Sequence, residues 1–192
     1  GFYKVSPISR VEVRRAGNGL SIDISGQIAA PRPFYAVPLG ADRFAVQGNA
    51  AVTHFAMDAG GHANRLDIEV NGHDALDAPR IDKAEAARIE AALAARLAMQ
   101  KPYPGSEKAL QLLLSDPAGG AGMSVDLARI RVQQKASREA YLARLGPVQS
   151  YTFAGVNKFG NDVYKVEHAH GMETVTLVVE RDGTLLSAFR HR

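Results

Sequence analysis

The sequence predicts an α+β protein in which a β-rich first domain precedes three helices packed on a four-stranded antiparallel sheet. Three observations support this fold class. Residues 1–80 contain short alternating segments separated by turn residues. Residues 82–145 carry helical periodicity with capping signals. Residues 146–190 contain four further alternating segments. We therefore predict two domains, residues 1–80 and residues 81–192.

Composition narrows the class of protein. The chain has 192 residues, 46% hydrophobic and 22% charged, as in ordinary globular proteins. A net charge of +3 is too small and too dispersed to predict nucleic-acid binding. The absence of cysteine excludes disulfides and thiolate chemistry. No apolar run approaches the roughly 18 residues of a membrane helix, so we expect no membrane span.

The first residues of the sequence lead to an expectation about how the protein is processed. The first residue is Gly1 rather than methionine, and no signal peptide is visible. We expect that a signal peptide or an upstream domain has been removed.

The first strands of the β-rich domain form a hairpin pattern. Arg10–Arg15 and Leu20–Ser25 alternate on either side of a turn at Gly17–Gly19. Pro31 and Pro33 then interrupt the chain, so Phe34–Val37 is predicted to be at best an edge strand.

Three more strands complete the predicted first domain: Arg43–Gln47, Ala50–Met57 and Asn64–Val70. Regularly spaced short strands are typical of a sheet or a partial barrel. Closure into a barrel requires Phe2–Val5 to join as well. The polar residues 71–81 are interpreted as a connector at the domain boundary.

The helical region begins at Asp82, which is predicted to be an N-cap with Glu85 as its capping-box partner. This helix is expected to reach Gln100. Ser106 is predicted to cap a second helix that stops at Asp116-Pro117, and a flexible link follows over residues 118–122. A third helix is predicted from Ser124 to Leu145, before Gly146-Pro147.

The third helix has an unusual stripe. Its apolar positions share a face with Gln134 and Ser137, so the stripe is polar in its middle. We treat these two residues as candidates for lining a ligand pocket.

The last region predicts four antiparallel strands: Gln149–Ala154, Asp162–His168, Glu173–Glu180 and Thr184–Phe189. Arg181-Asp182-Gly183 is a strong signal for the final hairpin, because Asp-Gly readily adopts positive φ.

Several segments resemble the C-terminal region of bacterial β-lactamase-like serine hydrolases of the penicillin-binding type. The second half matches that region's pattern at Leu145-Gly146, Ser150, Phe153, Gly155, Gly160, Asp162-Val163-Tyr164, Val166 and Asp182-Gly183. The first half matches at Leu39–Phe44, with Ala41 in place of a proline, and at Asp58–Ile68. This resemblance implies a lipocalin-like first domain and a second domain similar to NTF2-like or cystatin-like folds.

The catalytic signature of that hydrolase family is missing. Its Ser-x-x-Lys motif needs a serine three residues before a lysine, and no lysine here has one. Gly122–Asp126 begins like a nucleophile elbow, but it lacks the second glycine and a preceding strand. We interpret it as a loop and helix cap. The resemblance therefore implies an accessory part without the catalyst.

Asp162 and Tyr164 are also candidates for lining a ligand pocket. They share one face of a predicted strand, and NTF2-like sheets often line a pocket. There the pair can act as general base and oxyanion donor. The alternative is structural, with Asp162 satisfying the preceding turn and Tyr164 packing on the helices. We favour the structural interpretation.

Three other groups also have two interpretations. His168 and His170 can hold a metal only with further ligands, and an exposed turn is favoured. Arg131, Lys135 and Arg138 can bind a phosphate or an acidic partner, or they can form the solvated face of the third helix. The aromatic residues Phe34, Tyr35, Phe44 and Phe55 can line an apolar pocket or form the core.

The sequence thus favours a non-catalytic accessory or binding module, exported or periplasmic, with no cofactor and no metal. Expected partners are an upstream catalytic domain of its own, a second copy of the chain, or an apolar small molecule. The alternatives are a small stand-alone NTF2-like enzyme with Asp162 and Tyr164 in a pocket, or an apolar-ligand carrier.

Overall fold

The computed structural model describes residues 1–29, 32–115, 120–180 and 182–191. Its contacts divide the chain into two compact units, Gly1–Ala95 and Arg96–Arg192. The domain division predicted after residue 80 stays a prediction. The predicted features at Pro31, at Asp116-Pro117, at Arg181 and at residues 118–119 of the 118–122 link lie outside the described residues.

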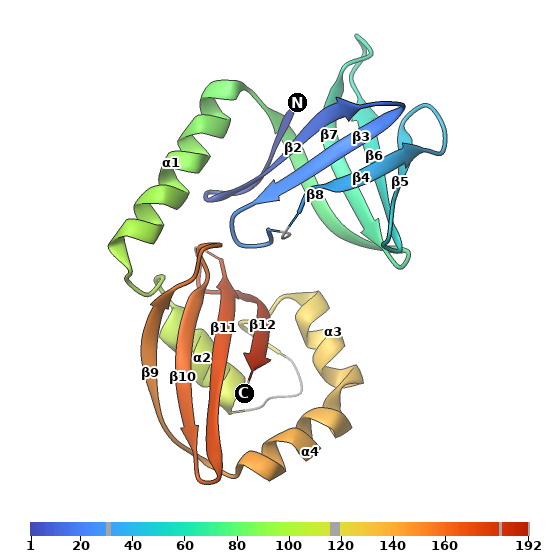
Figure 1. Ribbon diagram of the computed structural model, residues 1–192. Coiled ribbons are helices and arrows are strands. Elements are labelled where there is room, and N and C mark those ends of the chain that lie inside the picture. Colours follow the sequence, from blue (N-terminus) through green and yellow to red (C-terminus); the bar gives the residue numbers. More distant parts are fainter. Residues whose placement is uncertain (30–31, 116–119, 181, 192) are drawn as a thin grey trace. The chain divides into compact units, whose positions relative to one another are not determined.

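The first unit contains a closed antiparallel barrel in which each strand pairs with the next along the chain (Figure 1). The strands are β1 Phe2–Ser6, β2 Ser9–Ala16, β3 Gly19–Ser25, β4 Phe34–Pro38, β5 Arg43–Val46, β6 Ala51–Met57, β7 Ala63–Val70 and β8 His73–Ile81. Pairing of β1 with β8, at Phe2↔Ile81 and Tyr3↔Arg80, closes the barrel. The predicted hairpin of β2 and β3 is confirmed, with Val13 opposite Ile22.

Two predictions for this unit are wrong. The stretch interpreted as a polar connector forms β8, because its polar residues point outward while Ala78 is fully buried and Leu76 is partly buried. The segment predicted to be an edge strand, β4, pairs with β3 on one side and β5 on the other. Pro33 does not interrupt it, since this proline precedes the strand. The barrel is filled by its inward side chains: Tyr3, Val11, Val13, Ile22, Ala36, Val46, Ala51, Phe55, Leu66 and Ala78.

The helices are α1 Lys83–Met99, α2 Ser106–Leu114, α3 Val125–Gln133 and α4 Lys135–Leu145. Asp82 caps α1 as predicted, since its Oδ1 accepts a hydrogen bond from the Glu85 N–H at 2.7 Å. The N-cap residue of α2 is Gly105, whose φ is 81°. Ser106, which was predicted to be the cap, is instead the first residue of the helix. The prediction of a single third helix is also wrong, because the chain leaves the helical conformation at Gln134 and forms two helices, α3 and α4. No helix in the described part of the chain is long and apolar enough to cross a membrane.

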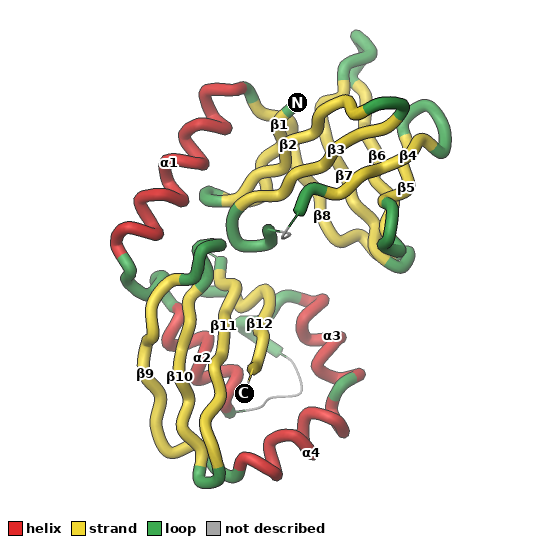
Figure 2. Tube along the Cα trace, viewed as in Figure 1, coloured by secondary structure: helices red, strands yellow, loops and turns green. Residues whose placement is uncertain are grey.

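The second unit is built on the predicted four-stranded antiparallel sheet, in the order β12-β11-β10-β9. Its strands are β9 Val148–Val156, β10 Asp162–His168, β11 Gly171–Val179 and β12 Leu185–His191. Helix α2 lies across one face of this sheet, as Figure 2 shows. Their common core contains Leu110 and Leu113 of α2 with Val166, Val175 and Leu177 of the sheet. The protein is therefore of the α+β class.

Candidate functional site

The second unit holds a pocket of about 530 Å³ between α3, α4 and the last strand, β12. Its apolar lining comes from α2, α3 and β12: Leu113, Leu127, Ile130, Leu186, Ala188 and Phe189. Its polar lining consists of Asp126, Arg131, Gln134, Ser137, Arg138, Tyr141, Ser187 and Arg190. This volume lies within the roughly 300–1,000 Å³ typical of small-molecule sites.

The break at Gln134 shapes the pocket. Gln134 has φ −91° and ψ 9°, so it leaves the helical conformation between α3 and α4. Side chains of α4 donate hydrogen bonds to two carbonyls at the break. Arg138 Nη1 donates to the Arg131 carbonyl at 2.5 Å, and Ser137 Oγ donates to the Gln134 carbonyl at 2.9 Å. The polar middle of the predicted stripe thus marks the bend.

A buried polar cluster adjoins this pocket. Glu173 on β11 is 1% exposed, and its Oε2 accepts a hydrogen bond from the Tyr141 hydroxyl at 3.0 Å. Its Oε1 lies 2.9 Å from His168 Nε2 and 3.4 Å from Arg190 Nη1. Tyr141 and Arg190 also line the pocket, so they connect the cluster to the ligand space.

The geometry restricts where protons lie in this cluster. His168 Nδ1 is 2.9 Å from the carbonyl oxygen of Gly146, which can only accept, so Nδ1 carries a hydrogen. The short contact of Nε2 with Glu173 then needs one more proton, carried by either the imidazole or the carboxyl group. His168 is therefore a buried core residue and not the solvated turn residue that was predicted.

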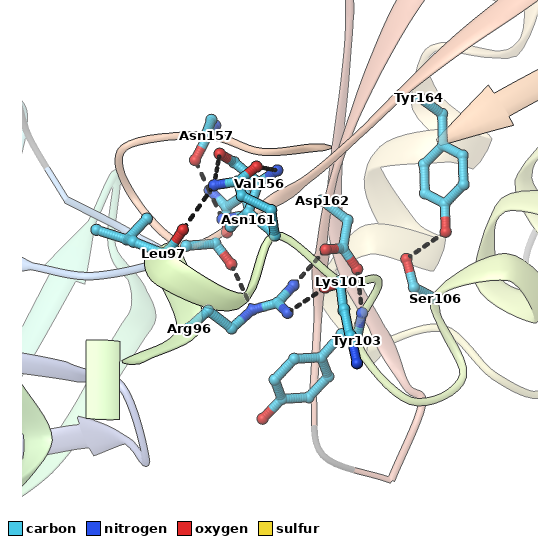
Figure 3. A network of polar contacts seen from close by, with 12 residues as sticks. Arg96, Leu97, Lys101, Tyr103, Ser106, Val156, Asn157, Asn161, Asp162 and Tyr164 are labelled. Carbon is cyan, nitrogen blue, oxygen red and sulfur yellow. Dashed lines mark hydrogen bonds and ion pairs between the residues drawn. The ribbon is translucent and has the colours of Figure 1, made fainter. Parts of the chain in front are cut away.

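Asp162 and Tyr164 lie elsewhere in the unit, in a network shown in Figure 3. Arg96 Nη2 donates to Asp162 Oδ1, and the Tyr103 N–H donates to Oδ2 at 2.8 Å. Arg96 also donates to the carbonyls of Gly160 and Lys101. Both carboxylate oxygens are thus bound by groups that hold the end of α1 and the following loop to β10.

Tyr164 makes a separate structural contact. Its hydroxyl donates to Ser106 Oγ at 3.0 Å at the start of α2, and the side chain is 2% exposed. Burial is the main cause that raises the pKa of this hydroxyl. The structure brings Gln134 and Ser137 together at one pocket, and it brings neither Asp162 nor Tyr164 to that pocket.

The row of cations on the third predicted helix is divided by the bend. Arg131 is 5% exposed and lines the pocket with Arg138. Lys135 is exposed and lies 3.8 Å from Glu139. Sequence reasoning singled out the arginines of the helix but not Arg190, which lines the same pocket from β12. The alternation Asp162, Tyr164, Val166, His168 was the one available signal that His168 points inward.

The aromatic residues of the first unit divide between core and pocket. Phe44 and Phe55 line a second pocket of about 310 Å³ at one end of the barrel. Phe55 also packs on Tyr3 and Phe44, with ring centroids 6.0 and 5.7 Å apart. Tyr35 instead donates to Asn18 Oδ1 at an exposed turn. In the described residues, no group of three or more His, Asp or Glu side chains is placed to hold a metal ion.

Comparison of this chain with protein-family models, with curated proteins and with solved structures finds no match.

Proposed function

We propose that this protein is a non-catalytic binding module whose second unit holds a small molecule between α3, α4 and β12. The observation that carries the proposal is the pocket itself, which combines an apolar wall with polar groups from α3, α4 and β12. Pockets of this composition and volume are the usual sites for small ligands.

The hydrogen bonds and ion pairs of the two buried carboxylates, Asp162 and Glu173, support a binding role over a catalytic one. A general base needs a free carboxylate oxygen within reach of a substrate proton. Asp162 has both oxygens bound by Arg96 and the Tyr103 amide. Glu173 has both oxygens facing Tyr141, His168 and Arg190. These side chains hold the fold together.

The sequence resemblance adds a biological context to the proposal. The segments Leu39–Phe44 and Asp162–Tyr164 resemble the accessory region of penicillin-binding-type hydrolases, whose finer folds are lipocalin-like and NTF2-like or cystatin-like. We extend the proposal accordingly to an exported accessory module that serves such a hydrolase or acts as a homodimer. The eight-stranded barrel agrees with a lipocalin-like first domain in general shape.

Titration with the neutral fluorescent probe phenylnaphthylamine tests the proposed pocket. Ser137→Trp places an indole at the pocket rim, from an exposed position on α4. We expect saturable binding to the native protein and its loss in this variant. Ala143→Trp, exposed on the same helix and outside the pocket lining, is the matched control and should bind as the native protein does. Binding that survives Ser137→Trp would contradict the proposal.

The pocket at the end of the barrel supports a second candidate, an apolar-ligand carrier. Its volume of about 310 Å³ is at the lower limit for a small-molecule site, and Phe44, Phe55 and Leu20 give it an apolar wall. If this is the binding site, Ala41→Trp at its rim abolishes probe binding, while Ser137→Trp leaves binding unchanged. The same titration therefore separates the two candidates.

A further inference from the structure

The charge of the cluster beside the α3–α4 pocket does not depend on where its proton lies. With His168 protonated, two cations, His168 and Arg190, face one anion, Glu173. With the proton on Glu173, the histidine and the carboxyl group are both neutral and Arg190 remains charged. Within these three described side chains, the net charge is therefore +1 in both states.

Arg190 is the cation of this cluster that also lines the pocket. Its side chain lines the pocket and is 13% exposed, and neither Nη1 nor Nη2 has a hydrogen-bond partner in the described residues. Its contact with Glu173, at 3.4 Å, is an ion pair without hydrogen-bond geometry. Buried N–H groups of an arginine are costly to leave unpaired, so an acceptor that reaches the Arg190 guanidinium from the pocket gains this hydrogen bonding.

Among the described residues, the other charged groups that line the pocket are Arg131, Arg138 and Asp126. Both arginines also take part in interactions within the protein, such as the hydrogen bond from Arg138 Nη1 to the Arg131 carbonyl. Asp126 Oδ1 also accepts a hydrogen bond from Arg129 Nη2 at 3.1 Å, which partly neutralises it. The positive groups share the pocket with apolar side chains such as Leu127 and Ile130.

Resting on the proposed function, we infer that the ligand of this pocket is an amphipathic organic anion. An apolar body packs on the lining of α3 and β12, and a carboxylate, phosphate or sulfonate head accepts hydrogen bonds from Arg190. Planar guanidinium groups suit such heads because they donate two parallel hydrogen bonds.

Two matched dyes test the inference. Anilinonaphthalene sulfonate and phenylnaphthylamine share an aromatic body, and only the first carries an anion. We expect the sulfonate to bind the native protein about tenfold more tightly, since hydrogen bonds to charged groups contribute more than neutral ones. Arg190→Met should remove this preference and leave the affinity for phenylnaphthylamine within about twofold.

Controls separate a charge effect from a loss of structure. Arg129→Met removes the same charge from α3 outside the pocket lining and should keep the preference. Because Arg190 also faces Glu173, Arg190→Lys provides a second variant that keeps the positive charge, and it should retain part of the preference for the sulfonate. A fall in affinity for both dyes, in both arginine variants, would overturn the inference.

The result also distinguishes this inference from the proposed function. Equal affinity for the two dyes, with both blocked by Ser137→Trp, refutes the anion preference and leaves a binding pocket. Binding of neither dye, or binding insensitive to Ser137→Trp, refutes both. Competition by naphthylacetate and by naphthyl phosphate then identifies which head group the arginines prefer.

Discussion

Asp162 shows how the same residue type can serve structure at a position where sequence suggested chemistry. The side chain is 1% exposed and its ion-pair partner Arg96 is 6% exposed. Two charges buried at this depth are tolerated because each has further hydrogen bonds, from the Tyr103 amide to the aspartate and from Arg96 to two carbonyls. Sequence reasoning placed Asp162 on the correct strand face but could not supply Arg96.

Replacing Asp162→Asn should destabilise the protein by about 3 kcal/mol, because it leaves the Arg96 cation buried without its anion. Chemical denaturation monitored by far-ultraviolet circular dichroism measures this change. Glu167→Gln, on the exposed face of the same strand, is the control and should change stability by less than about 0.5 kcal/mol. A fully stable Asp162→Asn protein that loses an enzymatic activity would favour the enzyme alternative.

The start of α3 couples a helix cap to the sheet. Ser124 Oγ accepts a hydrogen bond from the Leu127 N–H at 3.2 Å, which caps α3 as the sequence predicted. The Ser124 N–H donates to the Leu185 carbonyl at 3.0 Å, and Met123 forms a parallel bridge with Leu185. One serine thus fixes both where α3 begins and where it meets β12.

Ser124→Ala should lower the free energy of unfolding by about 1 kcal/mol, since the first turn of α3 loses its side-chain acceptor. Ser124→Asp retains an acceptor and should preserve most of the stability. Thermal unfolding of the two variants gives the comparison. Equal losses in both would show that the cap contributes nothing and that the contact with β12 dominates.

The end of α1 shows a similar dependence on distant groups. Gln100 adopts a positive φ of 48°, and its side-chain amide pairs with the backbone of Val156 on β9. Gly155, with φ 123°, makes room for this contact, because a Cβ there would lie 2.8 Å from Gln100 Oε1. The two prolines after Gln100 predicted the end of the helix, but not the role of the glutamine.

Each of the two compact units has its own core, and each core contains a buried tyrosine whose hydroxyl pKa is raised. Burial raises the pKa of Tyr3 in the barrel and of Tyr164 in the second unit above the ordinary value of 10.0. Arg80 opposes the shift at Tyr3, while hydrogen bonding to Ser106 opposes it at Tyr164. Both native hydroxyls therefore hold their protons more tightly than the unfolded chain does.

This linkage predicts a loss of stability at alkaline pH. The stabilising contribution is complete below pH 10, and it is lost as the pH rises from 10 towards the raised native pKa. Each tyrosine contributes a slope of up to about 1.4 kcal/mol per pH unit in that range. Tyr3→Phe and Tyr164→Phe should each gain stability relative to the native protein above pH 10. Denaturation curves between pH 8 and roughly 12 measure the slopes, and parallel slopes in all three proteins would contradict the prediction.

Local sequence was sufficient for the elements whose signals lie within a few neighbouring residues. Period-two alternation identified the strands of the second sheet, and Asp82 and Ser124 marked the starts of α1 and α3. These signals succeed because alternation and capping act between residues two or three positions apart.

Strand β8 and the pocket depend on partners that are distant in the chain. β8 has little apolar alternation of its own and is held by its pairing with β7 and β1. Glu173 and Arg190 become neighbours only because β11 and β12 pair, and Arg96 meets Asp162 across 66 residues. Burial of such charges is favourable only when all partners are in place, so the complete fold defines the site.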